Sequence, residues 1–172
     1  MGKQFLDDLV KQDCGIVKEN GGYVLKREEI GEPVSPPGLE PYKWTVDHLK
    51  GEGALEKVKL KACITGPFTL ASYVKTRNGV FPFNTAISDI EKIRQLASIV
   101  SESCRILAEG AYVISVDEPI LSVTVGTRLF FKYDERGIIE IYNDLKRSCR
   151  ERLTGTHICG RVSPHLAKTL LC

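Results

Sequence analysis

The feature that most constrains this chain is a regular alternation of short apolar segments with longer amphipathic ones, from residue 57 to residue 171. Strands are predicted at 58–64, 112–116 and 155–159, and a helical segment follows each of them. Long helical connections join parallel strands through right-handed crossovers. Apolar strands without strict alternation fit a sheet that is buried on both faces. The pattern therefore predicts an α/β fold around a parallel sheet.

Residues that favour helix ends support the helices of this region. Ser88-Asp89-Ile90-Glu91 is a capping box, and the helix that it starts has one apolar stripe, with Gly110 placed to end it. Asp134 is placed to cap a second helix, and Ser163-Pro164 supplies an N-cap and a first-turn proline for a third. A shorter helix is predicted over 68–74.

The first 56 residues have a less regular pattern. A short helix near the start and two short strands around Asn20-Gly21-Gly22 are predicted there. The segment 32–41 contains four prolines, which favour an extended arm over a helix or a central strand. We expect one incomplete domain over 1–172, with an irregular part at 1–56, a Pro-rich arm at 32–41 and regular βα units at 57–172.

Composition and charge exclude several classes of protein. The 24 basic residues nearly balance the 22 acidic ones, which is unlike a dedicated nucleic-acid or membrane-surface binder. No apolar run approaches the roughly 20 residues that span a bilayer, and no secretory signal is visible. Without a secretory signal, and in a chain this large and apolar, the six cysteines are expected to be reduced thiols in a cytoplasmic protein. They include no C-x-x-C pair, which argues against zinc-ribbon and thioredoxin-like proteins.

Three short motifs follow the three predicted strands. They are Thr65-Gly66-Pro67, Asp117-Glu118-Pro119 and His157-Ile158-Cys159-Gly160. Ligands of parallel α/β folds bind beyond the carboxyl ends of the strands. The three motifs are therefore expected to meet in one site.

His157 and Cys159 are candidate metal ligands. Residues two apart on a strand point the same way, and imidazole nitrogen and thiolate sulfur both bind zinc well. Zinc takes about four ligands, so the others must come from elsewhere or from a substrate. The alternative is a hydrogen-bonded histidine at a strand end and a buried thiol.

The acidic and glycine motifs are candidate substrate-binding groups. Asp117 and Glu118 are expected to point to opposite faces, so that one binds an ammonium group or acts as a base while the other pairs with a cation. Gly66 can let the backbone approach a ligand closely. The alternatives are acids that face solvent and a tight turn capped by Thr65.

Together and in this order, the three motifs resemble the catalytic domain of cobalamin-independent methionine synthase, over about residues 57–171. The similarity is closest to the short archaeal-type proteins. The superfamily also includes uroporphyrinogen decarboxylase and the zinc-dependent corrinoid methyltransferases. The resemblance implies an enzyme of methionine biosynthesis in which zinc activates the thiol of homocysteine for methylation by a methyl-folate or a methyl-corrinoid.

The resemblance also implies roles for individual residues. His157 and Cys159 would be zinc ligands, and Asp117 would bind the amino group of homocysteine. Glu118 would be a supporting residue, and Thr65 and Gly66 would help to line the pocket.

The implied fold is an eight-stranded β/α barrel, which typically needs about 250 residues. With 172 residues, we expect a partial TIM-type (β/α)8 barrel of about four βα units, with the family's further Glu and Cys ligands beyond Cys172. Uncovered strand edges predict self-association or a second chain that completes the barrel. The alternatives are a metal-independent decarboxylase-like relative acting on a tetrapyrrole and a non-catalytic half barrel.

Overall fold

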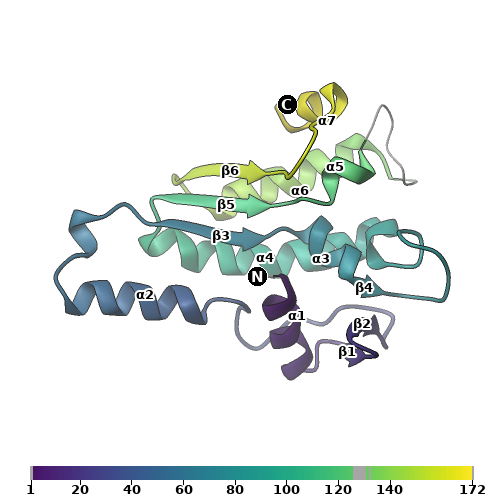
Figure 1. The fold of residues 1–172 in the computed structure, drawn as a ribbon, viewed down its shortest axis with the longest axis horizontal. Coiled ribbons are helices and arrows are strands. Elements are labelled where there is room, and N and C mark those ends of the chain that lie inside the picture. The colour runs from purple at the N-terminus through teal and green to yellow at the C-terminus, as the bar shows by residue number, and fades with distance from the viewer. Residues whose placement is uncertain (1, 126–130, 132, 172) are drawn as a thin grey trace.

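The three predicted strands form one parallel sheet in the computed structural model, which describes residues 2–125, 131 and 133–171. The sheet has the order β3 (Lys61–Thr65), β5 (Val113–Asp117), β6 (Leu153–His157), and the three arrows run side by side in Figure 1. The mixed α/β class and the parallel direction of the strands are thereby confirmed.

Two long helices pack against each other and support this sheet. They are α4 (Ile90–Gly110), which contacts β3 and β5, and α6 (Glu135–Ser148). The predicted stripe of α4 is buried at Ile93, Leu96 and Val100, and the helix ends at Gly110 as expected. Shorter helices complete the region: α3 (Pro67–Tyr73), α5 (Leu121–Thr124) and α7 (Pro164–Leu171).

Side-chain caps fix the starts of these helices. The Oδ1 atom of Asp134 accepts from the Gly137 N–H at 3.0 Å, and the Ser163 hydroxyl accepts from the Leu166 N–H at 3.1 Å. The predicted capping box is wrong in one detail, because Asp89 rather than Ser88 caps α4. Ser88 belongs to the short 3₁₀ turn η2 (Ala86–Ser88), where its hydroxyl donates to the Thr85 carbonyl instead.

Loss of the Asp134 cap is expected to destabilise the protein. Asp134→Ala leaves the Gly137 N–H without its acceptor and should lower the free energy of unfolding by about 1 kcal/mol. Asp134→Asn keeps a side-chain oxygen at this position and should cost less. Urea denaturation of both variants measures the difference, and equal losses would contradict the assignment of the cap.

The N-terminal part forms a second, separate sheet. The predicted helix is α1 (Gly2–Lys11), and the predicted strands are β1 (Ile16–Glu19) and β2 (Gly22–Leu25), which pair in an antiparallel hairpin. The turn has positive φ at Asn20 and Gly21, where these residue types are favoured. The strand β4 (Val74–Lys75) adds to β2 in parallel.

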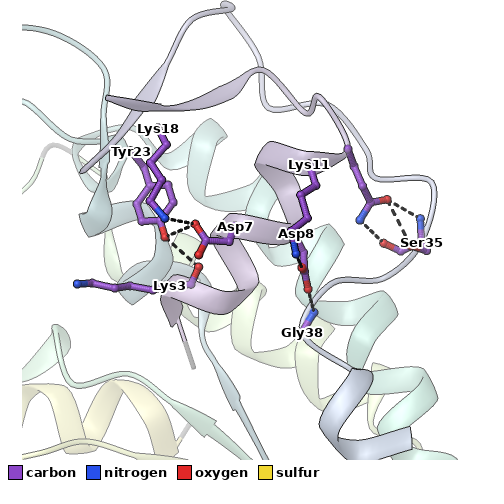
Figure 2. A network of polar contacts seen from close by, with 9 residues as sticks. Lys3, Asp7, Asp8, Lys11, Lys18, Tyr23, Ser35 and Gly38 are labelled. Atoms are coloured by element: carbon purple, nitrogen blue, oxygen red, sulfur yellow. Dashed lines mark hydrogen bonds and ion pairs between the residues drawn. The ribbon is translucent and has the colours of Figure 1, made fainter. Parts of the chain in front are cut away.

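The Pro-rich arm is fastened to α1 by polar contacts, as Figure 2 shows. Asp8 Oδ2 accepts from the Gly38 N–H at 2.9 Å. On the other side of α1, Asp7 Oδ1 lies 2.9 Å from the Lys18 ammonium and 2.8 Å from the Tyr23 hydroxyl. These two donors hold the pKa of Asp7 below its usual value. These contacts tie the arm and the hairpin to α1 within the first 56 residues.

The arm ends earlier than predicted. The helix α2 (Glu40–Gly51) starts inside it, with Pro41 in the first turn, where the missing N–H of proline is harmless. A single 3₁₀ turn, η1 (Leu55–Lys57), then leads to β3. None of the described helices is both long and apolar enough to cross a bilayer.

The expectation of a sheet buried on both faces is wrong for β3 and β6. The long helices cover one face, and on the other face Lys61 and Cys63 of β3 are exposed, although Thr65 and Ser115 on that same face are buried. All five residues of β6 are exposed. The strand contains only one apolar residue, Leu153, and no strand among the described residues pairs with its outer edge. The described residues form no closed barrel, since their parallel sheet has three strands and the hairpin belongs to the other sheet.

Candidate functional site

The three motifs meet at the carboxyl end of the parallel sheet, as predicted. Thr65, Asp117 and His157 are paired in register across β3, β5 and β6, so their side chains share one face. Two further backbone bonds extend the pairing, from Gly66 N–H to Asp117 O at 2.9 Å and from Glu118 N–H to His157 O at 2.8 Å. We call the three paired residues the strand-end row.

His157 lies between an acid and a thiol. Its Nδ1 atom is 3.7 Å from Asp117 Oδ1, and its Nε2 atom is 3.4 Å from Cys159 Sγ. His157 and Cys159 are both exposed, so the alternative of a buried thiol at Cys159 is wrong. The arrangement leaves one ring nitrogen for the carboxylate and directs the other toward the sulfur.

Cys159 reaches His157 by a different route from the one predicted. β6 ends at His157, so the two side chains are not alternating residues of one strand. The chain turns beyond the strand, with Gly160 at φ +95°, a value that glycine adopts without strain.

Asp117 is held in place by a residue that the sequence interpretation missed. The Ser115 hydroxyl donates to Asp117 Oδ1 at 2.9 Å, and Ser115 itself is buried. The spacing of Ser115 and Asp117 in the sequence indicates this contact, because residues two apart on a strand share a face. Ser115 therefore orients the carboxylate that faces His157.

Glu118 is a buried support and has no access to the open face. Its Oε1 accepts from the Phe68 N–H at 2.9 Å, and its Oε2 accepts from the Thr69 N–H at 2.7 Å and the Thr69 hydroxyl at 2.6 Å. Burial raises the pKa of Glu118 to about 7, although these hydrogen bonds oppose the shift. Of the two acids, Asp117 alone is placed to meet a substrate, and the alternative of a solvent-facing Glu118 is wrong.

Gly66 makes room for the side chain of Glu118. Its φ of −78° suits any residue, but a Cβ there would lie 2.2 Å from Glu118 Oε1. Gly66 therefore makes room for the carboxyl group, and it is also the N-cap of α3, the position that the alternative gave to Thr65. Thr65 is buried, and Gly2 packs close to its methyl group.

His157 and Cys159 have the chemistry of a partial zinc site. Zinc–nitrogen and zinc–sulfur bonds at tetrahedral angles place the two ligand atoms about 3.6 Å apart. The separation of 3.4 Å between His157 Nε2 and Cys159 Sγ matches this value. Within the described residues no group of three or more His, Cys, Asp or Glu side chains is arranged to hold a metal. A zinc ion bound by His157 and Cys159 would therefore need its other ligands from outside this group.

Comparison with known proteins gives no family assignment. A scan against protein-family models and a search of curated proteins both found no match for this chain. Evidence on function therefore comes from the geometry of the strand-end row and from the resemblance of its motifs.

Proposed function

We propose that the chain carries the zinc-binding, thiol-activating part of a methyltransferase of the methionine synthase type. The observation that supports the proposal most strongly is His157, with Nε2 3.4 Å from a thiol and Nδ1 3.7 Å from a carboxylate at the end of a parallel sheet. In this proposal the three-stranded sheet is part of a TIM-type barrel, whose other strands lie outside the described residues.

Asp117 lies beside one ring nitrogen of His157. A carboxylate beside Nδ1 favours the tautomer with its proton on that nitrogen, which leaves the lone pair of Nε2 for a metal. The hydrogen bond from the Ser115 hydroxyl orients the carboxylate of Asp117. The open face thus presents one imidazole nitrogen and one sulfur in a defined orientation.

Zinc held by His157 and Cys159 would act as a Lewis acid that keeps a substrate thiol ionised near neutral pH. The substrate proposed from the resemblance is homocysteine, and the methyl donor is a methyl-folate or a methyl-corrinoid. Asp117 Oδ2, which accepts no hydrogen bond from the described residues, is placed to bind the ammonium group of an amino-acid thiol.

Metal binding tests this proposal directly. Titration of the protein with Co²⁺ should give a near-ultraviolet thiolate-to-cobalt charge-transfer band, and both His157→Ala and Cys159→Ala should abolish it. Asp117→Asn should weaken cobalt binding by about 10- to 100-fold, because it removes the negative charge beside Nδ1. Cys63→Ala is the matched control, since Cys63 is also exposed on the open face. A wild-type protein without the band, or equal loss in Cys63→Ala, would refute the metal role.

A further inference from the structure

Two buried cysteines lie on the long helices α4 and α6, away from the strand-end row. Cys104 is in the second half of α4, and Cys149 is the C-cap of α6, just before β6 begins. The exposed fraction is 0% for Cys104 and 1% for Cys149, and both thiols are free. The proposed function uses neither of them, because its thiol is Cys159.

Contacts on both sides of the two cysteines fix the level of one helix against the other. Toward the start of the helices, Arg94 Nη2 lies 3.0 Å from Glu140 Oε2, a partner 46 positions later. Toward the end, Arg152 Nε donates to the Ala108 carbonyl at 2.8 Å, a partner 44 positions earlier. Cys104 and Cys149 are 45 positions apart and lie between these two contacts. The helices therefore run in the same direction and bring the two cysteines to the same level.

The two thiols interact directly and differ in acidity. The Cys104 thiol donates a hydrogen bond to the sulfur of Cys149. This bond holds the pKa of Cys149 below its usual value, although burial opposes the shift, and it raises the pKa of Cys104. A thiol that ionises readily beside a second thiol is the arrangement in which the first is oxidised and the second resolves it to a disulfide.

A small oxidant can approach the sulfur of Cys149 at the end of α6. The next residue, Arg150, has a φ of +55°, so the helix cannot continue through it. Helix ends open more readily than helix centres. A groove of about 500 Å³ between α4 and α6 also reaches this level, since its walls include Ser101, one turn before Cys104, and Ser148, directly before Cys149.

We propose that Cys104 and Cys149 form a site of oxidative modification, at which hydrogen peroxide converts the two thiols into a disulfide that joins α4 to α6. The Cys149 thiolate attacks one peroxide oxygen and the O–O bond breaks, which gives a sulfenic acid and, with the proton that Cys149 released, one water. The Cys104 sulfur then attacks Sγ of Cys149 and the S–O bond breaks. Hydroxide leaves with the proton of Cys104 as a second water. Each sulfur loses one electron, and the two peroxide oxygens gain the pair.

Mass spectrometry of the peroxide-treated native protein tests this proposal without any variant. After treatment with hydrogen peroxide at neutral pH, the remaining thiols are alkylated and the protein is digested with trypsin in the absence of reductant. The disulfide should link peptide 95–105 to peptide 148–150. This species should exceed every other pair of linked cysteines at least 10-fold, and dithiothreitol should remove it.

Variants separate the roles of the two thiols. Cys104→Ser and Cys149→Ser should both abolish the linked peptides. Cys104→Ser should in addition leave a sulfenic acid on Cys149 that dimedone labels, and Cys149→Ser should leave at least 10-fold less label on Cys104. Cys63→Ala is the matched control, because Cys63 is an exposed thiol outside the pair, and it should form the link as the wild type does.

The stability of the oxidised protein shows whether the bond forms in the native arrangement. A disulfide across this segment should lower the equilibrium constant for unfolding in urea at least 10-fold, and reduction should reverse the change. The proposal is overturned if the native protein gives no linked peptides, if they form only after unfolding in urea, or if the link leaves the unfolding equilibrium unchanged.

Discussion

Gly66→Ala is expected to lower the free energy of unfolding by about 3 kcal/mol. A Cβ at this position would lie 2.2 Å from Oε1 and 2.3 Å from Cδ of Glu118, so the carboxyl group must move. It would then leave the N–H groups of Phe68 and Thr69, which are buried. Urea denaturation followed by circular dichroism measures the loss.

Two further variants separate this clash from the general effect of replacing a glycine. Gly155→Ala lies in the same sheet, and nothing is within 4 Å of its added methyl group, so its stability should stay within about 1 kcal/mol of the wild type. Glu118→Ala combined with Gly66→Ala should show strong non-additivity, because the shortened side chain removes the clash. Equal losses for Gly66→Ala and Gly155→Ala would refute the proposed close approach.

The second large effect concerns pH. The pKa of Glu118 rises from its ordinary value of 4.5 to about 7 on folding, because burial disfavours the charged carboxylate. The folded protein therefore binds this proton more tightly than the unfolded chain does. The stability from this group is fully present below pH 4.5 and is lost as pH rises through about 7, by roughly 3 kcal/mol in total.

Glu118→Gln should remove this contribution to the pH dependence of the free energy of unfolding. The variant should also be less stable at low pH by about 1 to 3 kcal/mol, because an amide NH₂ cannot accept from the Thr69 N–H. Urea denaturation from pH 4.5 to pH 8 gives both quantities. Glu56→Gln, at an exposed glutamate, is the matched control. An unchanged slope in Glu118→Gln would show that another group is responsible.

The local features of the fold were predictable from the sequence. Apolar periodicity identified α4 and the parallel strands, and Asp134 and Ser163 cap helices as expected. The meeting of the three motifs followed from one rule, that parallel strands end at the same edge of their sheet. These features depend on residues close in sequence or on general topology.

The remaining features depend on contacts between distant residues. Glu118 bonds to Phe68 and Thr69, about 50 positions earlier, and no local pattern shows that this glutamate is buried while Asp117 is not. The helix α2 was missed because it buries only Val46 and leaves Trp44 exposed, so its apolar stripe is weak. The exposed face of the sheet was missed because short apolar strands do not reveal which face a helix covers.

The contact between Gly66 and Glu118 has an evolutionary consequence. The two residues belong to separate motifs 52 positions apart, yet the carboxyl group of one occupies the space where any side chain on the other would begin. A larger residue at position 66 fits only after position 118 has lost its long side chain. That loss removes the three hydrogen bonds that α3 makes to Glu118. A single substitution at either position lowers stability. Positions 66 and 118 are therefore expected to change together during evolution or to stay unchanged.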